Sequence, residues 1–170
     1  GDALPEINLY SPALDKVTPQ EKLELANRLE KRVKEADGRV ENGYNGVETG
    51  KHTLRIVNSY GLDRSFTENM CALFAQPNVR DGGFVSTGTY QQMRHSFDEL
   101  DADAVARESV RRAVDGLHAQ VIPSGKYRVI IENEVMSSLL GVFWTAFSAE
   151  AAQKGLSLLK GKLQTEIAAP

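Results

Sequence analysis

The sequence is poor in the residues that build disulfides and metal sites. It has 170 residues but only one cysteine, Cys71, and three histidines, His52, His95 and His118. One cysteine cannot form an internal disulfide or a cysteine-based zinc site. The histidines fall in separate segments, and none has a second histidine, a cysteine or a carboxylate at metal-ligand spacing. We therefore expect structural or surface histidines and a small, buried cysteine.

Long apolar runs and an excess of positive charge are missing as well. The chain has no run of about 18 apolar residues, so it predicts no transmembrane helix. Residues 1–5 lack the apolar core of a signal peptide. Lysine and arginine number 20 against 23 aspartate and glutamate residues, a formal net charge of -3. A mildly acidic chain lacks the field that supplies most nucleic-acid affinity. We expect a cytoplasmic protein that does not bind DNA directly.

The residues that are present are typical of a folded α+β protein. Hydrophobic residues make up 41% of the chain and charged residues 25%, which excludes a disordered tail or a fibre. Residues 1–17, with two prolines, predict an extended lead-in. Thr18-Pro19-Gln20-Glu21 combines a capping box with proline at the first helical position, which predicts a helix over 18–37. An apolar stripe after Asp101 predicts a second helix over 101–118.

Residues 39–96 between these helices predict antiparallel strands. Glycine and asparagine punctuate short runs that are rich in Val, Ile, Thr, Phe and Tyr. The turns are expected at Thr49-Gly50, Asn58-Ser59-Tyr60-Gly61 and Asp81-Gly82-Gly83. The runs between them are Val40–Glu48, His52–Asn58, Ser65–Gln76 and Phe84–His95. Four runs joined by short turns favour a meander with one solvent-exposed face.

The last third of the chain is unusually apolar. Residues 126–132 predict a further strand, and 133–163 predict helices. The stretch from Asn133 to Phe147 is apolar nearly all round, so it should be buried on most sides. We expect a single α+β unit over 1–170 whose last helices are covered by more protein. The residues expected to make that contact are Leu139, Leu140, Val142, Phe143, Trp144 and Phe147.

No catalytic constellation emerges from the residues alone. No Gly-x-Ser-x-Gly elbow surrounds any of the candidate serines. Pro123-Ser124-Gly125-Lys126 contains a Gly-Lys pair, but it lacks the first glycine of a phosphate loop and precedes a predicted strand instead of a helix. Acidic residues at the predicted helix starts complement the helix dipoles without any catalytic role.

The order of several segments resembles the TldD/PmbA family, whose members are described as proposed modulators of DNA gyrase. The resemblance runs from the Leu9-Tyr10-Ser11-Pro12 lead-in through the Asn58-Ser59-Tyr60-Gly61 turn. It is clearest in Pro123-Ser124-Gly125-Lys126-Tyr127, the Ser138-Leu139-Leu140-Gly141 stretch and the segment 154–163. Family members carry an α/β segment before this region and a β-rich domain after it. The resemblance therefore implies that this chain is a piece of a longer protein.

The resemblance also implies which kind of subunit this is. TldD-type subunits carry His-Glu-x-x-x-His on the apolar helix and bind a metal, usually zinc, for peptide hydrolysis. Here Gly141 and Ala146 stand where the histidines would be, and Val142 stands where the glutamate would be. None of these side chains can bind a metal or accept a proton. The chain thus resembles the PmbA type, also called TldE, with no catalytic or metal-binding residue and with zinc expected only in a TldD-type partner.

Three functions follow as hypotheses. The first is a non-catalytic subunit that joins a TldD-like metallopeptidase subunit in peptide or protein processing, as part of a homo- or hetero-oligomer. The second is an active peptidase that uses a metal or nucleophile not evident in the sequence. The third is regulation of DNA gyrase by protein–protein contact. We favour the first, because the chain resembles the subunit type that lacks the metal motif.

Overall fold

The computed structural model describes residues 8–167, and the chain divides into two compact units, Gly1–Val121 and Ile122–Pro170. The sequence predicts a single unit instead. Between the last helix of the first unit and the first helix of the second lie residues 116–132, which have no regular secondary structure. Val121 is fully exposed and Ile122 is 66% exposed, as is common at a domain boundary.

An antiparallel four-stranded sheet forms the first unit. Its strands are β1 (Val40–Val57), β2 (Asp63–Asp81), β3 (Phe84–Thr87) and β4 (Tyr90–Arg94). β2 is central, because β1 pairs along one edge of it while β3 and β4 pair with successive parts of the other edge. The predicted antiparallel sheet is confirmed. Asn58 closes the β1–β2 turn by accepting hydrogen bonds from the Tyr60 and Leu62 amides.

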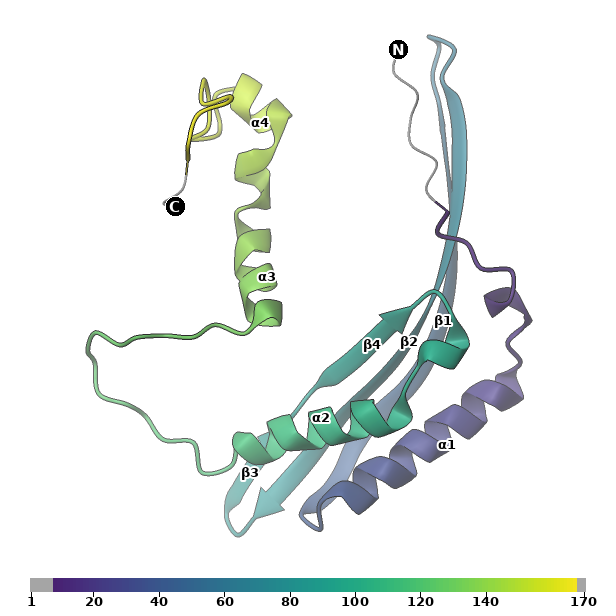
Figure 1. Cartoon of the computed structure of the whole chain (residues 1–170), viewed down its shortest axis with the longest axis vertical. Helices are drawn as coiled ribbons and strands as arrows, with labels where there is room; N and C mark the ends of the chain where they lie inside the picture. The colour runs from purple at the N-terminus through teal and green to yellow at the C-terminus, as the bar shows by residue number, and fades with distance from the viewer. Residues whose placement is uncertain (1–7, 168–170) are drawn as a thin grey trace. The chain divides into compact units, whose positions relative to one another are not determined.

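The predicted turn at Thr49-Gly50 is wrong. β1 continues through it, with Thr49 opposite Cys71 and Gly50 opposite Met70. The unbroken partner strand β2 satisfies the backbone of this stretch, and that tertiary pairing overrides the local turn signal of glycine. The β1–β2 hairpin is consequently much longer than the sequence suggests, and its far part extends beyond the helices (Figure 1).

The predicted run Phe84–His95 is broken at Gly88 into β3 and β4. Gly88 is buried, and a Cβ atom added to it would lie 2.2 Å from the Ser109 carbonyl oxygen and 2.3 Å from the Ala113 nitrogen. Only glycine permits the backbone to approach the helix that carries Ser109 so closely. The strand is therefore interrupted where it meets that helix.

Two helices lie against one face of the sheet, α1 (Pro19–Ala36) and α2 (Ala102–Asp115) (Figure 1). Both begin as the sequence predicts. The Thr18 hydroxyl accepts from the Glu21 amide, and the Glu21 carboxylate accepts from the Thr18 amide at 2.7 Å. Asp101 caps α2 by accepting from the Asp103 and Ala104 amides. Short 3-10 turns, η1 (Leu14–Lys16) and η2 (Phe97–Glu99), precede the two helices.

The core of the first unit lies between these helices and the sheet. Burial alternates along β2, where Cys71, Leu73 and Ala75 are fully buried while the residues between them are partly exposed. These side chains pack with Leu29 of α1 and Val105 of α2. The expected burial of Cys71 is confirmed. Burial raises the pKa of its thiol, which favours the unreactive protonated form.

The second unit consists of short helices, α3 (Asn133–Val142), the 3-10 turn η3 (Trp144–Phe147) and α4 (Ala149–Gln153). The predicted strand over 126–132 is not formed. Val129 and Ile130 are 70% and 95% exposed, and no strand of the described chain pairs with them. The predicted helices over 133–163 also end early, since Gly155 and Gly161 have positive φ angles that favour turns. Within residues 8–167, no helix is both long and apolar enough to cross a membrane.

Candidate functional site

The histidines of the protein have separate, structural surroundings. His95 Nδ1 lies 2.8 Å from the Asn69 carbonyl oxygen, and His118 Nε2 lies 3.1 Å from Asp81 Oδ2. His52 Nδ1 lies 4.0 Å from Glu68 Oε1 on the β1–β2 hairpin. Among the described residues, 8–167, no group of three or more histidine, cysteine or acidic side chains could hold a metal ion.

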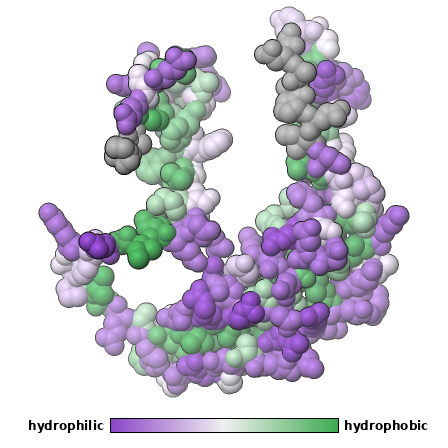
Figure 2. Space-filling view, in the orientation of Figure 1, coloured by the Kyte–Doolittle hydropathy of each residue, from purple (hydrophilic) through white to green (hydrophobic). Residues whose placement is uncertain are grey.

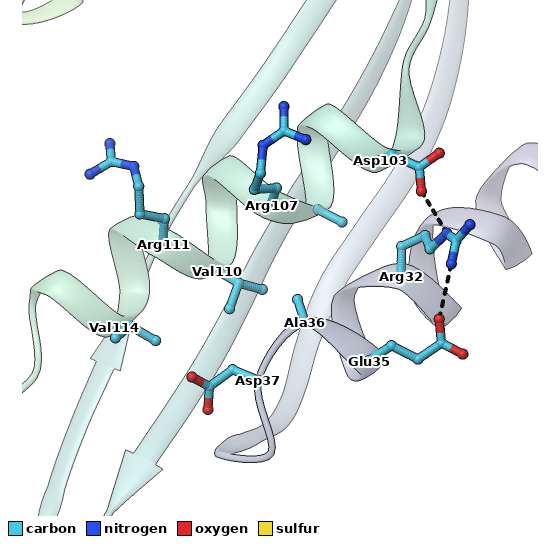
Figure 3. A pocket seen from close by; sticks show the side chains of 10 residues that line it. Arg32, Glu35, Ala36, Asp37, Asp103, Arg107, Val110, Arg111 and Val114 are labelled. Carbon is cyan, nitrogen blue, oxygen red and sulfur yellow. Dashed lines mark hydrogen bonds and ion pairs between the residues drawn. The ribbon is translucent and has the colours of Figure 1, made fainter.

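A polar cavity of the first unit lies between α1 and α2 (Figure 3). It has a volume of about 520 Å³, and charged side chains of both helices line it. Arg32 bridges the two helices, with Nε 2.5 Å from Asp103 Oδ1 and Nη1 3.3 Å from Glu35 Oε2. Arg28 also pairs with Asp103, and this contact lowers the pKa of the carboxyl. These charges join the helices to each other, and the lining contains no serine, threonine, cysteine or histidine.

The apolar surface of α3 and η3 is the stronger candidate. A cavity of about 700 Å³ on this surface is bounded almost wholly by apolar side chains and two small polar ones. Its lining residues are Asn133, Met136, Ser137, Leu140, Gly141, Trp144 and Phe147. Figure 2 shows hydrophobic residues gathered along the α3 and η3 column. Exposed apolar surface of this extent is typical of a protein contact.

The structure brings three of the six predicted contact residues, Leu140, Trp144 and Phe147, to the lining of this cavity. The other three are outside its lining. All six are exposed, from 45% for Leu139 to 75% for Trp144. None is buried by the described residues, so the apolar side chains of α3 and η3 remain available for contact.

Three of the cavity residues were missed in the sequence. Asn133, Met136 and Ser137 precede Leu140 by seven, four and three positions, so all lie on one face of α3 with it. The spacing i, i+3, i+4, i+7 was readable in the sequence. This spacing did not identify one contact face, because apolar residues lie on every side of the helix.

The end of α3 positions the aromatic part of the surface. The helix stops at Val142, where the Phe143 amide donates to the Leu140 carbonyl, and the chain tightens into η3. Ser157 is buried and holds this turn from further along the chain, because its hydroxyl donates to the Ala146 carbonyl at 2.6 Å. The break between α3 and η3 corrects the expectation of one helix from Asn133 to Phe147.

Gly141, Val142 and Ala146 lie in this same region. Gly141 and Val142 form the last turn of α3, and Ala146 lies in η3. A Cβ atom added to Gly141 would meet no heavy atom within 4 Å, so the space around it is open. None of the three side chains carries a nitrogen, oxygen or sulfur atom that could bind a metal or accept a proton. These three positions lie within an exposed apolar surface.

Both units match models of one protein family. Residues 12–117 match the PmbA/TldA metallopeptidase central domain, and residues 124–170 match the PmbA/TldA metallopeptidase C-terminal domain. The boundary between the matches coincides with the boundary between the compact units at Val121 and Ile122. The sequence is also 24% identical over 165 residues to Metalloprotease PmbA of Escherichia coli O157:H7, covering 96% of this chain and 36% of that protein.

Solved structures of similar proteins show the same fold. A proposed modulator of DNA gyrase from Thermotoga maritima has a TM-score of 0.85 and 27% identity, over 97% of this chain and 38% of its own. Another from Bacteroides thetaiotaomicron has a TM-score of 0.86 and 21% identity, over 99% and 39%. TldE from Thermococcus kodakarensis has a TM-score of 0.64 and 22% identity, over 93% and 36%.

The chain thus spans little more than a third of the length of these relatives. The central-domain match lies within the first compact unit, and the C-terminal-domain match lies within the second. Because the central-domain model alone covers more than half of the chain, the protein belongs to the PmbA/TldA metallopeptidase family.

Proposed function

We propose that this chain acts as a non-catalytic, PmbA/TldE-like subunit of a TldD/PmbA-type metallopeptidase system that processes peptides or proteins. The observation that carries the proposal is the nature of the α3–η3 surface. It is exposed and apolar, and Gly141, Val142 and Ala146 supply no metal ligand there. A peptidase needs a group that activates water, and this surface has none.

The α3–η3 surface acts in this proposal as the contact for a TldD-like subunit. Aromatic side chains dominate the energetics of many protein interfaces, because a large apolar area is buried at small cost in side-chain entropy. Phe143 is 60% exposed and Trp144 is 75% exposed, so both can be buried by a partner. Zinc and peptide substrate would be held by the TldD-like subunit, while this chain shapes the assembly.

Binding to a TldD-like subunit that carries the His-Glu-x-x-x-His helix tests the proposal. Trp144 is the only tryptophan of the chain, so its fluorescence is a direct reporter of this surface. We expect its emission to shift to the blue on binding, measured with a tryptophan-free TldD-like subunit. Phe143→Asp should weaken the complex at least about tenfold, because a desolvated charge opposes burial of the surface.

Leu158→Asp is the matched control, because Leu158 is 95% exposed and does not line the α3–η3 cavity. It should bind as the unchanged chain does. Metal analysis of the separated subunits should find zinc with the TldD-like subunit. Stoichiometric zinc together with peptide hydrolysis in this chain alone would overturn the proposal and favour an active peptidase.

Regulation of DNA gyrase is a second candidate, supported by the description of the Thermotoga maritima relative as a proposed modulator of that enzyme. The net charge of -3 favours contact with the gyrase protein over contact with DNA. A supercoiling assay with gyrase tests it. A change in supercoiling rate that is lost with Phe143→Asp and kept with Leu158→Asp would favour this function.

A further inference from the structure

The far end of the β1–β2 hairpin forms a two-stranded arm, residues 52–68, beyond the reach of the helices (Figure 1). β4 pairs with β2 only from Cys71 to Ala75, and β3 pairs with it further on. Within residues 8–167, no third strand pairs with the arm. Every residue from Lys51 to Phe66 is exposed.

One face of this arm is apolar at its centre. Leu54 and Phe66 are opposite each other in the register, so their side chains point to the same face. They are 41% and 43% exposed, and the neighbouring Ile56 is 51% exposed. The face continues that of Phe74 on β2, which is the face of the sheet without helices. A two-stranded ribbon is marginally stable in water, so burial of this apolar face would stabilise the arm.

Two side chains of opposite charge, Arg64 and Glu68, lie on the same face at equal distances from the apolar centre. Arg64, opposite Ile56, lies two pairs nearer the hairpin turn than Leu54 and Phe66, and Glu68, opposite His52, lies two pairs nearer the base. Arg64 has no ion-pair partner among the described residues. Glu68 has only His52, 4.0 Å away, which is a counter-charge only when the imidazole is protonated.

We propose that this face of the arm docks on the same face of a second copy of this chain. The two-fold axis of this dimer would lie between the two faces, perpendicular to the strands, at the level of the Leu54–Phe66 pair. It would place Phe66 against Phe66 of the second copy. The same operation places Arg64 of each chain opposite Glu68 of the other, because the two residues are equally far from the axis along β2. The arm is therefore self-complementary in charge, as an isologous interface requires.

The size of the face limits the strength of this contact. The paired residues from His52 to Ile56, with the turn beyond, extend about 20–30 Å at 3.4 Å per residue. Such a ribbon buries less than the roughly 800 Å² per partner of a stable interface. We expect a reversible dimer that forms with rising concentration, with a dissociation constant on the order of 10–100 µM. This interaction is separate from the α3–η3 contact proposed above.

Charge reversal tests the docking, with sedimentation velocity of the 170-residue chain over a wide concentration range as the readout. Arg64→Glu and Glu68→Arg should each weaken the dimer at least about tenfold, because each places like charges opposite one another at two symmetric positions. The double variant R64E/E68R should restore dimerisation to within about threefold of the unchanged chain. Only direct contact between the two positions across the axis gives that restoration.

The controls separate the arm from other surfaces. Arg107→Glu reverses an exposed arginine on α2 and should leave the dimer unchanged. Phe143→Asp should also leave it unchanged, whatever its effect on a TldD-like partner. The inference is overturned if the single arm variants dimerise normally, or if the double variant is as weak as either single one. It is also overturned if no dimer forms at high concentration.

Discussion

The side-chain amide of Asn69 pairs with both backbone groups of Ser11, 58 positions earlier. Asn69 Oδ1 accepts from the Ser11 amide at 2.8 Å, and Asn69 Nδ2 donates to the Ser11 carbonyl at 2.8 Å. The same Nδ2 also donates to Asp15 Oδ1 at 3.1 Å. One buried residue of β2 thereby holds the segment that leads into α1 against the sheet.

We expect Asn69→Ala to destabilise the first unit by about 2 kcal/mol, because it leaves the Ser11 amide without its partner and the Ser11 carbonyl with only the Leu14 amide. Urea unfolding should show a lower midpoint with an unchanged slope. Asn42→Ala is the matched control, since exposed Asn42 makes only a surface hydrogen bond with Asn78, and it should change stability by less than about 0.5 kcal/mol. Equal effects of the two variants would contradict the structural role of Asn69.

Asp15 predicts a dependence of stability on pH. The hydrogen bond from Lys51 lowers the pKa of Asp15 from 3.8 to about 2, with help from Tyr10 and Asn69. A carboxyl with a depressed folded-state pKa stabilises the fold above its unfolded pKa and loses that effect as the pH falls through the folded value. Stability should therefore decline between about pH 5 and pH 2.

Asp15→Asn isolates this contribution, because asparagine keeps the shape of the side chain and removes the charge. Urea unfolding of both proteins across the pH range should show a difference near neutral pH that shrinks towards pH 2. A difference that stays constant with pH would show that the charge of Asp15 has no part in it. Asp37 and Glu108 also have pKa values lowered to about 2 by neighbouring arginines, so the unchanged chain should lose stability over the same range.

Gly88→Ala should destabilise the first unit by about 3 kcal/mol, because the new methyl group would overlap the backbone of α2 at Ser109 and Ala113. Backbone atoms cannot move aside as a flexible side chain can. Gly50→Ala is the control, since a Cβ atom there meets nothing within 4 Å. Thermal unfolding should show a large decrease in the melting temperature for the first variant and almost none for the second. A tolerated Gly88→Ala would mean that β3, β4 and α2 are not packed this closely.

The candidate contact surface was only partly predictable. The sequence shows that the stretch from Asn133 to Phe147 is apolar, and it names Leu140, Trp144 and Phe147, which line the cavity. It does not show the break at Phe143, since no glycine or proline marks that position and Ser157, which binds the Ala146 carbonyl, lies 11 positions further along the chain. The strand over 126–132 was predicted from its β-branched residues, but a strand needs a neighbour, and the described chain provides none.

The sequence by itself determined the features that depend on nearby residues. The Thr18 and Asp101 caps, the Asn58–Gly61 turn and the lack of metal-binding side chains at Gly141 and Ala146 all follow from local chemistry. Only the tertiary structure decided the unbroken β1, the break at Gly88 and the pairing of Asn69 with Ser11. Each of these depends on contacts between groups that are far apart in the chain. Such contacts outweigh local conformational preferences, because buried polar groups can no longer form hydrogen bonds with water.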